Sequence, residues 1–301
     1  MWAETYKKWL HASYHKLNTF IGKLFGESAQ YKFIYTLRTG RWLNLKDPKN
    51  LNEKMFWLAR YWKNPMMTQC ADKYKVREFL ASKGCDDILN ELYGVYEDAR
   101  EIDFATLPNK FAVKCNHGSG MNVVCEDKTQ LDIPKTISQL NEWLQFQFGR
   151  GVEWQYKAIP RKIIAEKYLD GEMIEYQVWC FNGNPVMFLV RNDLRCSEAD
   201  QTRQSYAVTY TPEWERVFYR KGEEKYTQDI PKPVNYEKML DYAKRLSADF
   251  PQVRVDFYEV DKKLVFGEMT FSSHGNILSN YKPDVLLMLG EKLILPEPLN
   301  Q

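Results

Sequence analysis

Hydrophobic side chains recur at intervals of three and four residues in several parts of the chain, and each such part predicts an amphipathic helix. Residues 1–65 show the pattern on both sides of a polar, turn-rich break, TLRTGRWLNLKDPKNLNEK. The same spacing predicts helices at residues 72–84 and 134–148, the latter reaching Phe148, and at 235–250 and 286–293. Asp72 and Pro134 suit the starts of the first two, and Gly84 suits the end of the first.

Runs rich in β-branched and aromatic residues alternate with these helices and predict antiparallel strands. FAVKC and NVVC flank a glycine-containing loop, and KIIAEKYL is a strand that runs into a linker. EYQVWCFNGNPVMFLVRND predicts a hairpin around Asn182-Gly183, and RVDFYEVDKKLVFGEMT a second hairpin about Lys262. Residues 192–233 are polar and turn-rich, with short strand-like pieces. Short helices that alternate with antiparallel hairpins indicate an α+β fold.

Composition narrows the class of protein. The chain has 301 residues, 44% hydrophobic and 27% charged, which suits one large or two moderate globular domains. Its 42 basic and 40 acidic residues nearly cancel, which argues against a nucleic-acid binder that relies on bulk charge. The 19 tyrosines and nine tryptophans fit either aromatic surfaces for sugars or partners, or additional core residues.

The cysteine, histidine and hydropathy patterns predict whether the protein is cytosolic, holds a metal centre or crosses a membrane. Six scattered cysteines without a CxxC pair predict reduced core thiols of a cytosolic protein, and the four histidines are not spaced for a zinc or iron centre. No segment approaches 18 apolar residues, and the start lacks the apolar core of a secretory signal. The first 25 residues mix aromatic residues with lysines, which suits either a membrane surface or packing against the rest of the protein.

The stretch FAVKCNHGSGM is the first that suggests chemistry. Lys114 ends a strand, and Gly118, Ser119 and Gly120 follow within six residues. Glycines let backbone N–H groups approach an anion closely, and the lysine adds a compact positive charge. The stretch matches neither GxxxxGK[ST] nor GxGxxG, so a plain tight turn with an exposed lysine remains an alternative. His117 taken alone is better explained as a turn residue.

The stretch IIAEKYLDGEMIEYQVW suggests a nucleotide contact. Where the strand ends, the backbone groups of Lys167 and Leu169 suit the edge of an adenine, and a glutamate a few residues on suits ribose hydroxyls. A solvated strand end with charged residues explains this segment better when it is taken alone.

The second hairpin brings two acids together. Folding about Lys262 places Asp256 opposite Glu268 and Arg254 opposite Thr270. Carboxylates that close repel unless a cation intervenes, and Mg²⁺ with a nucleotide phosphate takes such oxygen ligands. Arg254 then suits a reacting phosphoryl or carboxyl oxygen. A plain ion pair between Arg254 and one acid is the alternative. The residues expected on the opposite, core-facing side are Val255, Phe257, Val265 and Met269.

A DK helix, a strand lysine with a glycine loop, a Glu-Lys-x-Leu linker, a hairpin and RxD…E follow one another along the chain. This order resembles the ATP-grasp superfamily, the fold of D-alanine–D-alanine ligases and related carboxylate–amine ligases, over roughly residues 70–275. DKYKVREFL, LPNKFAVKCNHGSG, EYQVWCFNG and VRVDFY…GEMTF look like its TupA-like branch, associated with teichuronopeptide, capsule and cell-wall polysaccharide loci. The resemblance implies an α+β ATP-grasp fold, in which two subdomains grip ATP. Its expected parts are a helical N-terminal segment (1–69), an N-terminal lobe (70–165) and a C-terminal lobe (166–301).

The resemblance also implies roles for individual residues. Lys114 and Arg254 are the implied catalytic residues, the first at the phosphates and the second beside the acyl phosphate. Asp256 and Glu268 match the magnesium ligands. Thr270 stands where many members have asparagine, so the second metal position is expected to be looser or completed by water. The residues implied to bind the nucleotide are Lys73, Lys114, His117, Gly118, Ser119, Gly120, Glu166, Lys167, Leu169 and Glu175.

The activity implied by the resemblance is an ATP-dependent ligase that uses Mg²⁺ and joins a carboxylate to an amine through an acyl phosphate. The expected partners are an amine and a sugar or amino-acid carboxylate, such as a uronic acid in bacterial capsule or cell-surface polysaccharide synthesis, and no nucleic acid. The expected location is the cytoplasm, with peripheral association with membrane-bound polysaccharide machinery left open. Three alternatives also stay open: a glycosyltransferase (although no motif with DxD spacing is present), a sugar kinase and a non-catalytic nucleotide-binding component.

Overall fold

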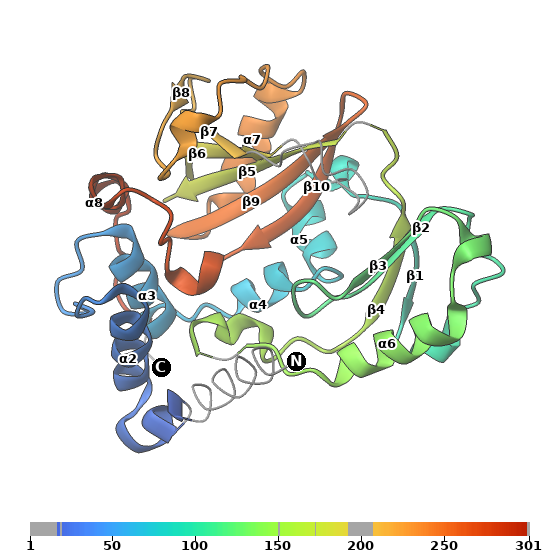
Figure 1. Cartoon of the computed structure of the whole chain (residues 1–301), viewed down its shortest axis with the longest axis horizontal. Coiled ribbons are helices and arrows are strands. Elements are labelled where there is room, and N and C mark those ends of the chain that lie inside the picture. Colours follow the sequence, from blue (N-terminus) through green and yellow to red (C-terminus); the bar gives the residue numbers. More distant parts are fainter. Residues whose placement is uncertain (1–16, 19, 150, 172, 192–206, 300–301) are drawn as a thin grey trace. The chain divides into compact units, whose positions relative to one another are not determined.

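The computed structural model describes residues 17–18, 20–149, 151–171, 173–191 and 207–299, and the chain forms two compact units (Figure 1). As far as its residues are described, the first unit comprises Met1–Lys63, Arg150–Trp154 and Ser272–Gln301. The second comprises Asn64–Gly149 and Gln155–Phe271. The lobe boundaries expected at residues 69 and 165 stay a prediction.

The first unit is helical, and its helices separated by a polar break are those expected from the sequence. Helix α2 ends at Gly40, whose φ of 69° is the left-handed conformation that glycine adopts readily. Helix α3 begins after Asn50, which forms a reciprocal capping box with Glu53. Tyr31 packs edge-on against Phe56, with ring centroids 5.6 Å apart, and joins the two helices. Among the described residues of this unit, residues 20–25 are helical, and the labelled helices are α2 (Glu27–Thr39), α3 (Leu51–Tyr61) and α8 (Pro283–Lys292).

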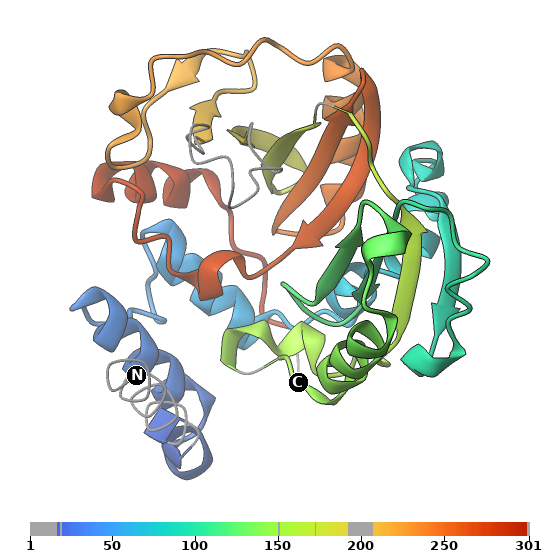
Figure 2. The ribbon, with the colours of Figure 1, turned by 45° about the vertical axis from the view of Figure 1, so that its right-hand side comes forward.

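The second unit contains two antiparallel sheets, which Figure 2 shows from a second angle. The four-stranded sheet has the order β1-β4-β2-β3 and the six-stranded sheet the order β10-β9-β5-β6-β7-β8. The strands of the first are β1 (Leu92–Tyr96), β2 (Phe111–Cys115), β3 (Asn122–Cys125) and β4 (Ile163–Lys167). Those of the second are β5 (Met173–Phe181), β6 (Asn184–Arg191), β7 (Ala207–Tyr210), β8 (Arg216–Val217), β9 (Gln252–Val260) and β10 (Lys263–Thr270).

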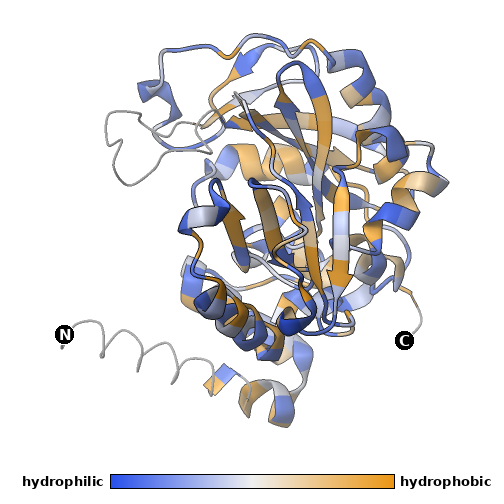
Figure 3. Ribbon diagram, turned by 90° about the vertical axis from the view of Figure 1, so that its right-hand side faces the viewer, coloured by the Kyte–Doolittle hydropathy of each residue, from blue (hydrophilic) through white to orange (hydrophobic). Residues whose placement is uncertain are grey.

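Helices cover one face of each sheet. Helix α6 packs on β2, and α7 packs on β5, β6 and β9. Cys180 of β5 pairs in register with Val253 of β9, and its sulfur lies 3.8 Å from the carbonyl oxygen of Ala243 in α7. Val178 and Tyr176, which alternate with Cys180 along β5, therefore face α7 as well, and Figure 3 shows hydrophobic residues throughout the sheets. The α-helices of this unit are α4 (Met66–Ala71), α5 (Val76–Ser82), α6 (Ile133–Gln145) and α7 (Tyr236–Ser247). Short 3-10 helices lie at Asp86–Ile88, Ala99–Glu101, Lys128–Gln130, Gly151–Tyr156, Glu223–Lys225 and Ser273–Asn276.

Several helix boundaries differ from the sequence prediction: α7 ends at Ser247 and not at Phe250, and α8 begins at Pro283 and not at Leu286. Helix α5 begins only at Val76, because Asp72 caps the preceding turn by accepting from the N–H groups of Tyr74 and Lys75. Helix α6 ends at Gln145, so Phe148 lies beyond it instead of continuing its apolar face. The spacing of apolar residues could not show the difference at the start of α5, because the turn is set by local hydrogen bonds to the Asp72 side chain.

The two predicted hairpins are present. Asn182 and Gly183 both have positive φ, at 50° and 78°, as the tight turn between β5 and β6 requires. In the second hairpin Asp256 pairs with Glu268 and Arg254 with Thr270, as expected.

A bulge at Gly267 changes the register on the turn side of that second hairpin. The expected core position of Val265 is therefore wrong: it pairs with Tyr258 and is half-buried, whereas Phe266 is buried opposite Phe257.

Five of the six cysteines, all except Cys196, are buried free thiols, and Cys196 lies outside the described residues. Within the part of the chain that the structure describes, no helix is long and apolar enough to cross a membrane.

The bulge predicts a stability effect at Gly267. A Cβ at this position would lie 2.9 Å from the carbonyl oxygen of Asp256, and a backbone atom cannot move aside cheaply. Gly267→Ala should lower the free energy of unfolding by about 1–3 kcal/mol, measured by urea denaturation. Gly94→Ala is the control, because Gly94 also borders a bulge but its Cβ would meet the hydroxyl end of Tyr96, which can rotate. Equal losses in both variants would contradict the prediction.

Candidate active site

One face of the six-stranded sheet carries the polar residues expected at the site. Residues that pair directly across antiparallel strands share a face, and so do residues two apart along one strand. Glu175 pairs with Tyr258, two residues after Asp256, and Asp256 pairs with Glu268. The strands therefore bring together, on the face opposite α7, Glu175, Arg254, Asp256, Glu268 and Thr270.

Arg254 is the centre of this cluster. Its Nε donates to Asp256 Oδ1 at 2.7 Å and its Nη2 to Asp256 Oδ2 at 2.5 Å, a two-point pairing. The same Nη2 lies 3.4 Å from Glu268 Oε1 and 3.2 Å from Thr270 Oγ1, and Thr270 donates to Glu268 Oε1 at 2.9 Å. The structure thus contains the ion pair of the alternative interpretation, and it adds a second acid to the same guanidinium.

Burial sets the electrostatics of the acids. Asp256 is 1% exposed, and burial raises the pKa of its carboxyl to about 7 even though Arg254 favours the charged form. The side chain of Glu268 is 38% exposed. Burial acts to raise the pKa of Glu268, but Lys73 and Arg254 together hold it below its usual value. Burial also raises the pKa of Glu175, against the effect of Arg191 at 3.5 Å.

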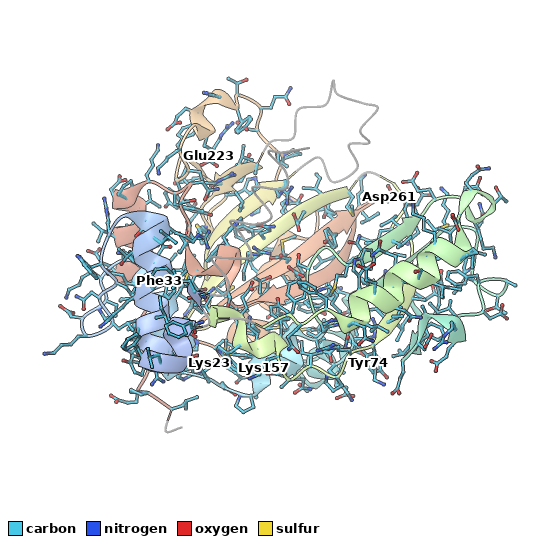
Figure 4. All side chains as sticks on the ribbon, turned by 60° about the horizontal axis from the view of Figure 1, so that its bottom comes forward. Lys23, Phe33, Tyr74, Lys157, Glu223 and Asp261 are labelled. Carbon is cyan, nitrogen blue, oxygen red and sulfur yellow. The ribbon has the colours of Figure 1, made fainter. Side chains whose placement is uncertain are left out.

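Lys73 links the two sheets of the second unit. Its Nζ donates to the carbonyl oxygen of Gly118 at 2.7 Å and lies 3.7 Å from Glu268 Oε2. Gly118 belongs to the glycine loop, residues 117–120, between β2 and β3. One lysine therefore contacts both the predicted phosphate-binding loop and a predicted metal ligand. In Figure 4, Tyr74 marks the turn that carries this lysine and Asp261 marks the tip of the β9–β10 hairpin.

Lys114 lies on β2 and pairs with a second predicted residue, Glu166 of β4. Lys114 Nζ is 2.5 Å from Glu166 Oε2, and Arg77 of α5 approaches the other oxygen at 3.7 Å. Glu166 is buried, so its charge needs these partners. In this arrangement the Lys114 ammonium is engaged by a carboxylate, and contact with a phosphate requires that it share or exchange that partner.

The expected adenine contact at Lys167 is only partly available. The N–H of Lys167 donates to the carbonyl of Glu91, and its carbonyl accepts from the side chain of Asn90 at 2.8 Å. Both backbone groups of Lys167 are therefore already used by the segment before β1. The backbone of Leu169 forms no hydrogen bond with a described residue, and it is the remaining candidate for the adenine edge.

The glycine loop has a buried and an exposed side. His117 is 1% exposed, its Nε2 lies 3.2 Å from the carbonyl oxygen of Phe146, and burial lowers its pKa. The buried His117 ring therefore supports the glycine loop and does not belong to the side that a ligand can reach. A Cβ on Gly118 would lie 2.4 Å from the ring of Phe148, so only glycine fits there. Ser119 and Gly120 are exposed and form the side that a ligand can reach.

Four polar residues of the site were not found from the sequence: Asp72 as a buried acceptor, Arg77, Asn116 and Arg191. Arg77 and Arg191 each pair with a predicted glutamate from another element. Asn116 takes part in five hydrogen bonds at the end of β2, three through its side chain and two through its backbone. Only Asn116, two residues after Lys114, had a sequence signal, namely its place at the start of the glycine loop.

The donor chemistry fits a hard cation. Asp256, Glu268 and Thr270 offer oxygen ligands only, as Mg²⁺ requires. Among the described residues no cluster of three or more His, Cys, Asp or Glu side chains is placed to hold a metal ion. Two carboxylates and a hydroxyl leave most of a six-oxygen shell to other ligands, such as nucleotide phosphates and water.

The fold and this arrangement define the class of protein. A sequence model described as TupA-like ATPgrasp matches residues 53–294, most of the chain. The chain therefore belongs to the TupA-like ATP-grasp family, as the sequence motifs indicated. No curated protein sequence matches it.

Solved structures show the same fold. The chain is similar to L-amino acid ligase from Bacillus licheniformis, with a TM-score of 0.50 and 14% identity over 91% of this chain and 63% of that one. It is also similar to D-alanyl-alanine synthetase A from Vibrio cholerae (TM-score 0.43, 14% identity, 74% of this chain and 61% of that one). D-alanine–D-alanine ligase from Bacillus anthracis complexed with ATP gives a TM-score of 0.42 and 15% identity over 75% and 68%. The chain spans about three fifths of the length of the first two. Identity this low shows the fold alone. Together with the family match, the likeness to L-amino acid ligase confirms the expected α+β ATP-grasp fold, and the first unit supplies the expected helical N-terminal region.

The raised pKa of Asp256 predicts a dependence of stability on pH. The folded protein keeps a proton on this carboxyl up to about pH 7, whereas an unfolded aspartate releases it near pH 3.9. The free energy of unfolding should therefore fall as pH rises from about 4 to 7, by at most about 1.4 kcal/mol per pH unit from this group. Asp256→Asn should remove that part of the slope in denaturation series from pH 4 to 8. An identical slope in both proteins would show that Asp256 ionises normally.

Proposed function

We propose that this protein is an ATP-dependent carboxylate–amine ligase that uses Mg²⁺. The observation that carries the proposal is the cluster of Arg254, Asp256 and Glu268 on one sheet face, with Lys73 connecting Glu268 to the glycine loop. Family membership supports an ATP site at this place.

Each residue is assigned a role in binding the nucleotide or the metal ion that suits its charge. Lys73 and Lys114 neutralise the phosphates, and the exposed side of the glycine loop covers them through Ser119 and Gly120. Leu169 offers its backbone to the adenine, and Glu175, on the same sheet face as the acids, accepts from the ribose. Asp256 and Glu268 hold Mg²⁺, which when bound draws the phosphate oxygens together and neutralises their charge.

In this proposal, Arg254 is the residue that acts in the chemical step. The substrate carboxylate attacks the γ-phosphorus of ATP, the bond to the β–γ bridging oxygen breaks, and ADP leaves as an acyl phosphate forms. An amine then attacks the acyl carbon, phosphate departs and the amine loses a proton to give an amide. Negative charge accumulates at the reacting oxygens in both steps, and a fixed guanidinium stabilises it without reorganisation. The chain's main contribution is positioning and charge neutralisation.

The proposed carboxylate is a uronic acid or a related sugar carboxylate of a bacterial capsule or cell-surface polysaccharide, with an amino acid or small amino alcohol as the amine. The association of the branch with polysaccharide loci supports this choice. The proposed location is the cytoplasm, peripheral to the membrane machinery that assembles such polymers.

Product analysis tests the reaction class. With ATP, Mg²⁺ and a panel of uronic acids and amines, ADP and phosphate should appear in equal amounts only when an acid and an amine are both present. Phosphate is measured by colorimetry and the amide by mass spectrometry. ADP without free phosphate, together with a phosphorylated sugar, would identify a kinase. Transfer from a UDP-sugar with no use of ATP would identify a glycosyltransferase and overturn the proposal.

Glu268→Gln tests the metal assignment. The amide removes the negative charge that binds Mg²⁺ while it keeps the shape of the side chain, so turnover should fall at least a hundredfold with the fold intact. Circular dichroism and the unfolding midpoint check the fold. Glu237→Gln is the matched control, since Glu237 is an exposed residue of α7 that pairs only loosely with Lys232, at 3.6 Å. Undiminished turnover of Glu268→Gln would remove Glu268 from the metal site.

A further inference from the structure

Asn116 has no part in the reaction proposed above, yet its side chain joins three separate segments around the site. It lies directly after β2, two residues beyond Lys114, and is fully buried. Its Nδ2 donates to Asp72 Oδ1 at 2.8 Å and to the carbonyl of Pro160 at 2.9 Å. Its Oδ1 accepts from the N–H of Lys162 at 2.8 Å. The amide thus joins β2, the segment before β4 and the turn before α5.

The backbone of Asn116 forms two further hydrogen bonds, one with Lys162 and one with Lys73. Its N–H donates to the carbonyl of Lys162 at 3.0 Å, and its carbonyl accepts from the N–H of Lys73 at 3.2 Å. Lys73 is therefore tied to Asn116 directly through the backbone, and indirectly through Asp72, its neighbour in the chain. Two independent contacts fix the position from which the Lys73 side chain projects.

Asp72 completes the connection. The same oxygen that accepts from Asn116 also accepts from the N–H groups of Tyr74 at 2.8 Å and Lys75 at 3.2 Å. Asp72 is 3% exposed, so this oxygen has little access to water and depends on these three donors. Loss of the Asn116 amide would remove the side-chain contact to Asp72 and leave the turn tied to Asn116 only through the backbone bond from Lys73.

The contacts of the Lys73 side chain tolerate only a small shift of its backbone. Its Nζ reaches Gly118 of the glycine loop at 2.7 Å and Glu268 at 3.7 Å, so a shift of about 1 Å at the backbone is enough to break one of these contacts. A long lysine side chain is flexible, and the rigidity of its backbone limits where the ammonium can lie.

We propose that Asn116 is a positioning residue: together with Asp72 it holds the backbone of Lys73 so that the ammonium lies between the glycine loop and Glu268, where it meets the outer phosphates of the nucleotide. This inference rests on the proposed function, because it takes those phosphates as the ligand of Lys73. Asn116 itself touches no substrate and acts only through Lys73.

A comparison of two nucleotides separates positioning from general stability. Mg·ADP carries a β-phosphate for Lys73 to contact, and AMP does not. In titration calorimetry on the full chain, Asn116→Ala should weaken Mg·ADP binding about tenfold and leave AMP binding within about twofold of the original protein. A merely structural role would weaken both nucleotides alike, and that result overturns the proposal.

A double-mutant cycle shows whether Asn116 acts through Lys73. Lys73→Met should weaken Mg·ADP binding at least tenfold, and addition of Asn116→Ala to it should cause little further loss, because the lysine to be positioned is absent. If the two losses of Mg·ADP affinity multiply in the double variant, the two residues act independently, contrary to the proposal.

Asn141→Ala is the matched control. Asn141 of α6 also pairs with an aspartate, since it donates to Asp98 at 3.0 Å and accepts from the N–H of Ala99 at 2.9 Å, but it contacts neither Lys73 nor the glycine loop. The Asn141→Ala variant should lose stability, but the ratio of its Mg·ADP affinity to its AMP affinity should be the same as in the original protein.

Asp72 provides a second route if Asn116→Ala does not fold. Asp72→Asn retains an oxygen that can accept all three hydrogen bonds, and it should bind Mg·ADP within about threefold of the original protein. Asp72→Ala removes the acceptor and should reproduce the loss of Mg·ADP affinity. Equal affinities of these two variants would contradict positioning. If the original protein binds neither nucleotide, the proposed function itself has failed and the role of Asn116 falls with it.

Discussion

The buried pairing of Arg254 with Asp256 is the interaction on which the site depends. Taking a carboxylate out of water is costly, and Asp256 is almost wholly enclosed between strands. The guanidinium meets it with two hydrogen bonds and turns its remaining donor capacity to Glu268 and Thr270. Even so, the pKa of Asp256 stays high, because burial of the carboxyl outweighs the effect of the guanidinium, and Glu268 and Glu175 raise it further. A site with that imbalance favours the arrival of a further cation.

The second constraint is that the site draws on both sheets of the second unit. The acids and Arg254 come from the six-stranded sheet, whereas Lys114, Glu166 and the glycine loop come from the four-stranded one. Lys73 belongs to neither sheet and contacts both. Each sheet supplies charges of both signs, and Lys73 adds a positive charge next to both; the proposed binding of a polyanion with its metal ion would use both signs.

Sequence reasoning succeeded where one strand pairing fixes the outcome. The register of the β9–β10 hairpin follows from its turn and its alternation, so Asp256 opposite Glu268 could be foreseen. It failed where a local irregularity intervened, since the bulge at Gly267 moved Val265 out of the core. It also failed to foresee that Lys167 uses its backbone groups on Asn90 and Glu91, because neither neighbour is close in sequence to the adenine segment.

The sequence by itself determined the α+β class and the family, and it predicted which side chains carry the expected chemistry, because motif order and alternation are properties of the chain alone. Only the tertiary structure decided how those side chains are paired. Lys114 meets Glu166, and Asn116 meets Asp72, at separations of 52 and 44 positions along the chain respectively. Hydrogen bonds of this kind depend on angles and distances that are set when separate elements pack, and no local pattern encodes them.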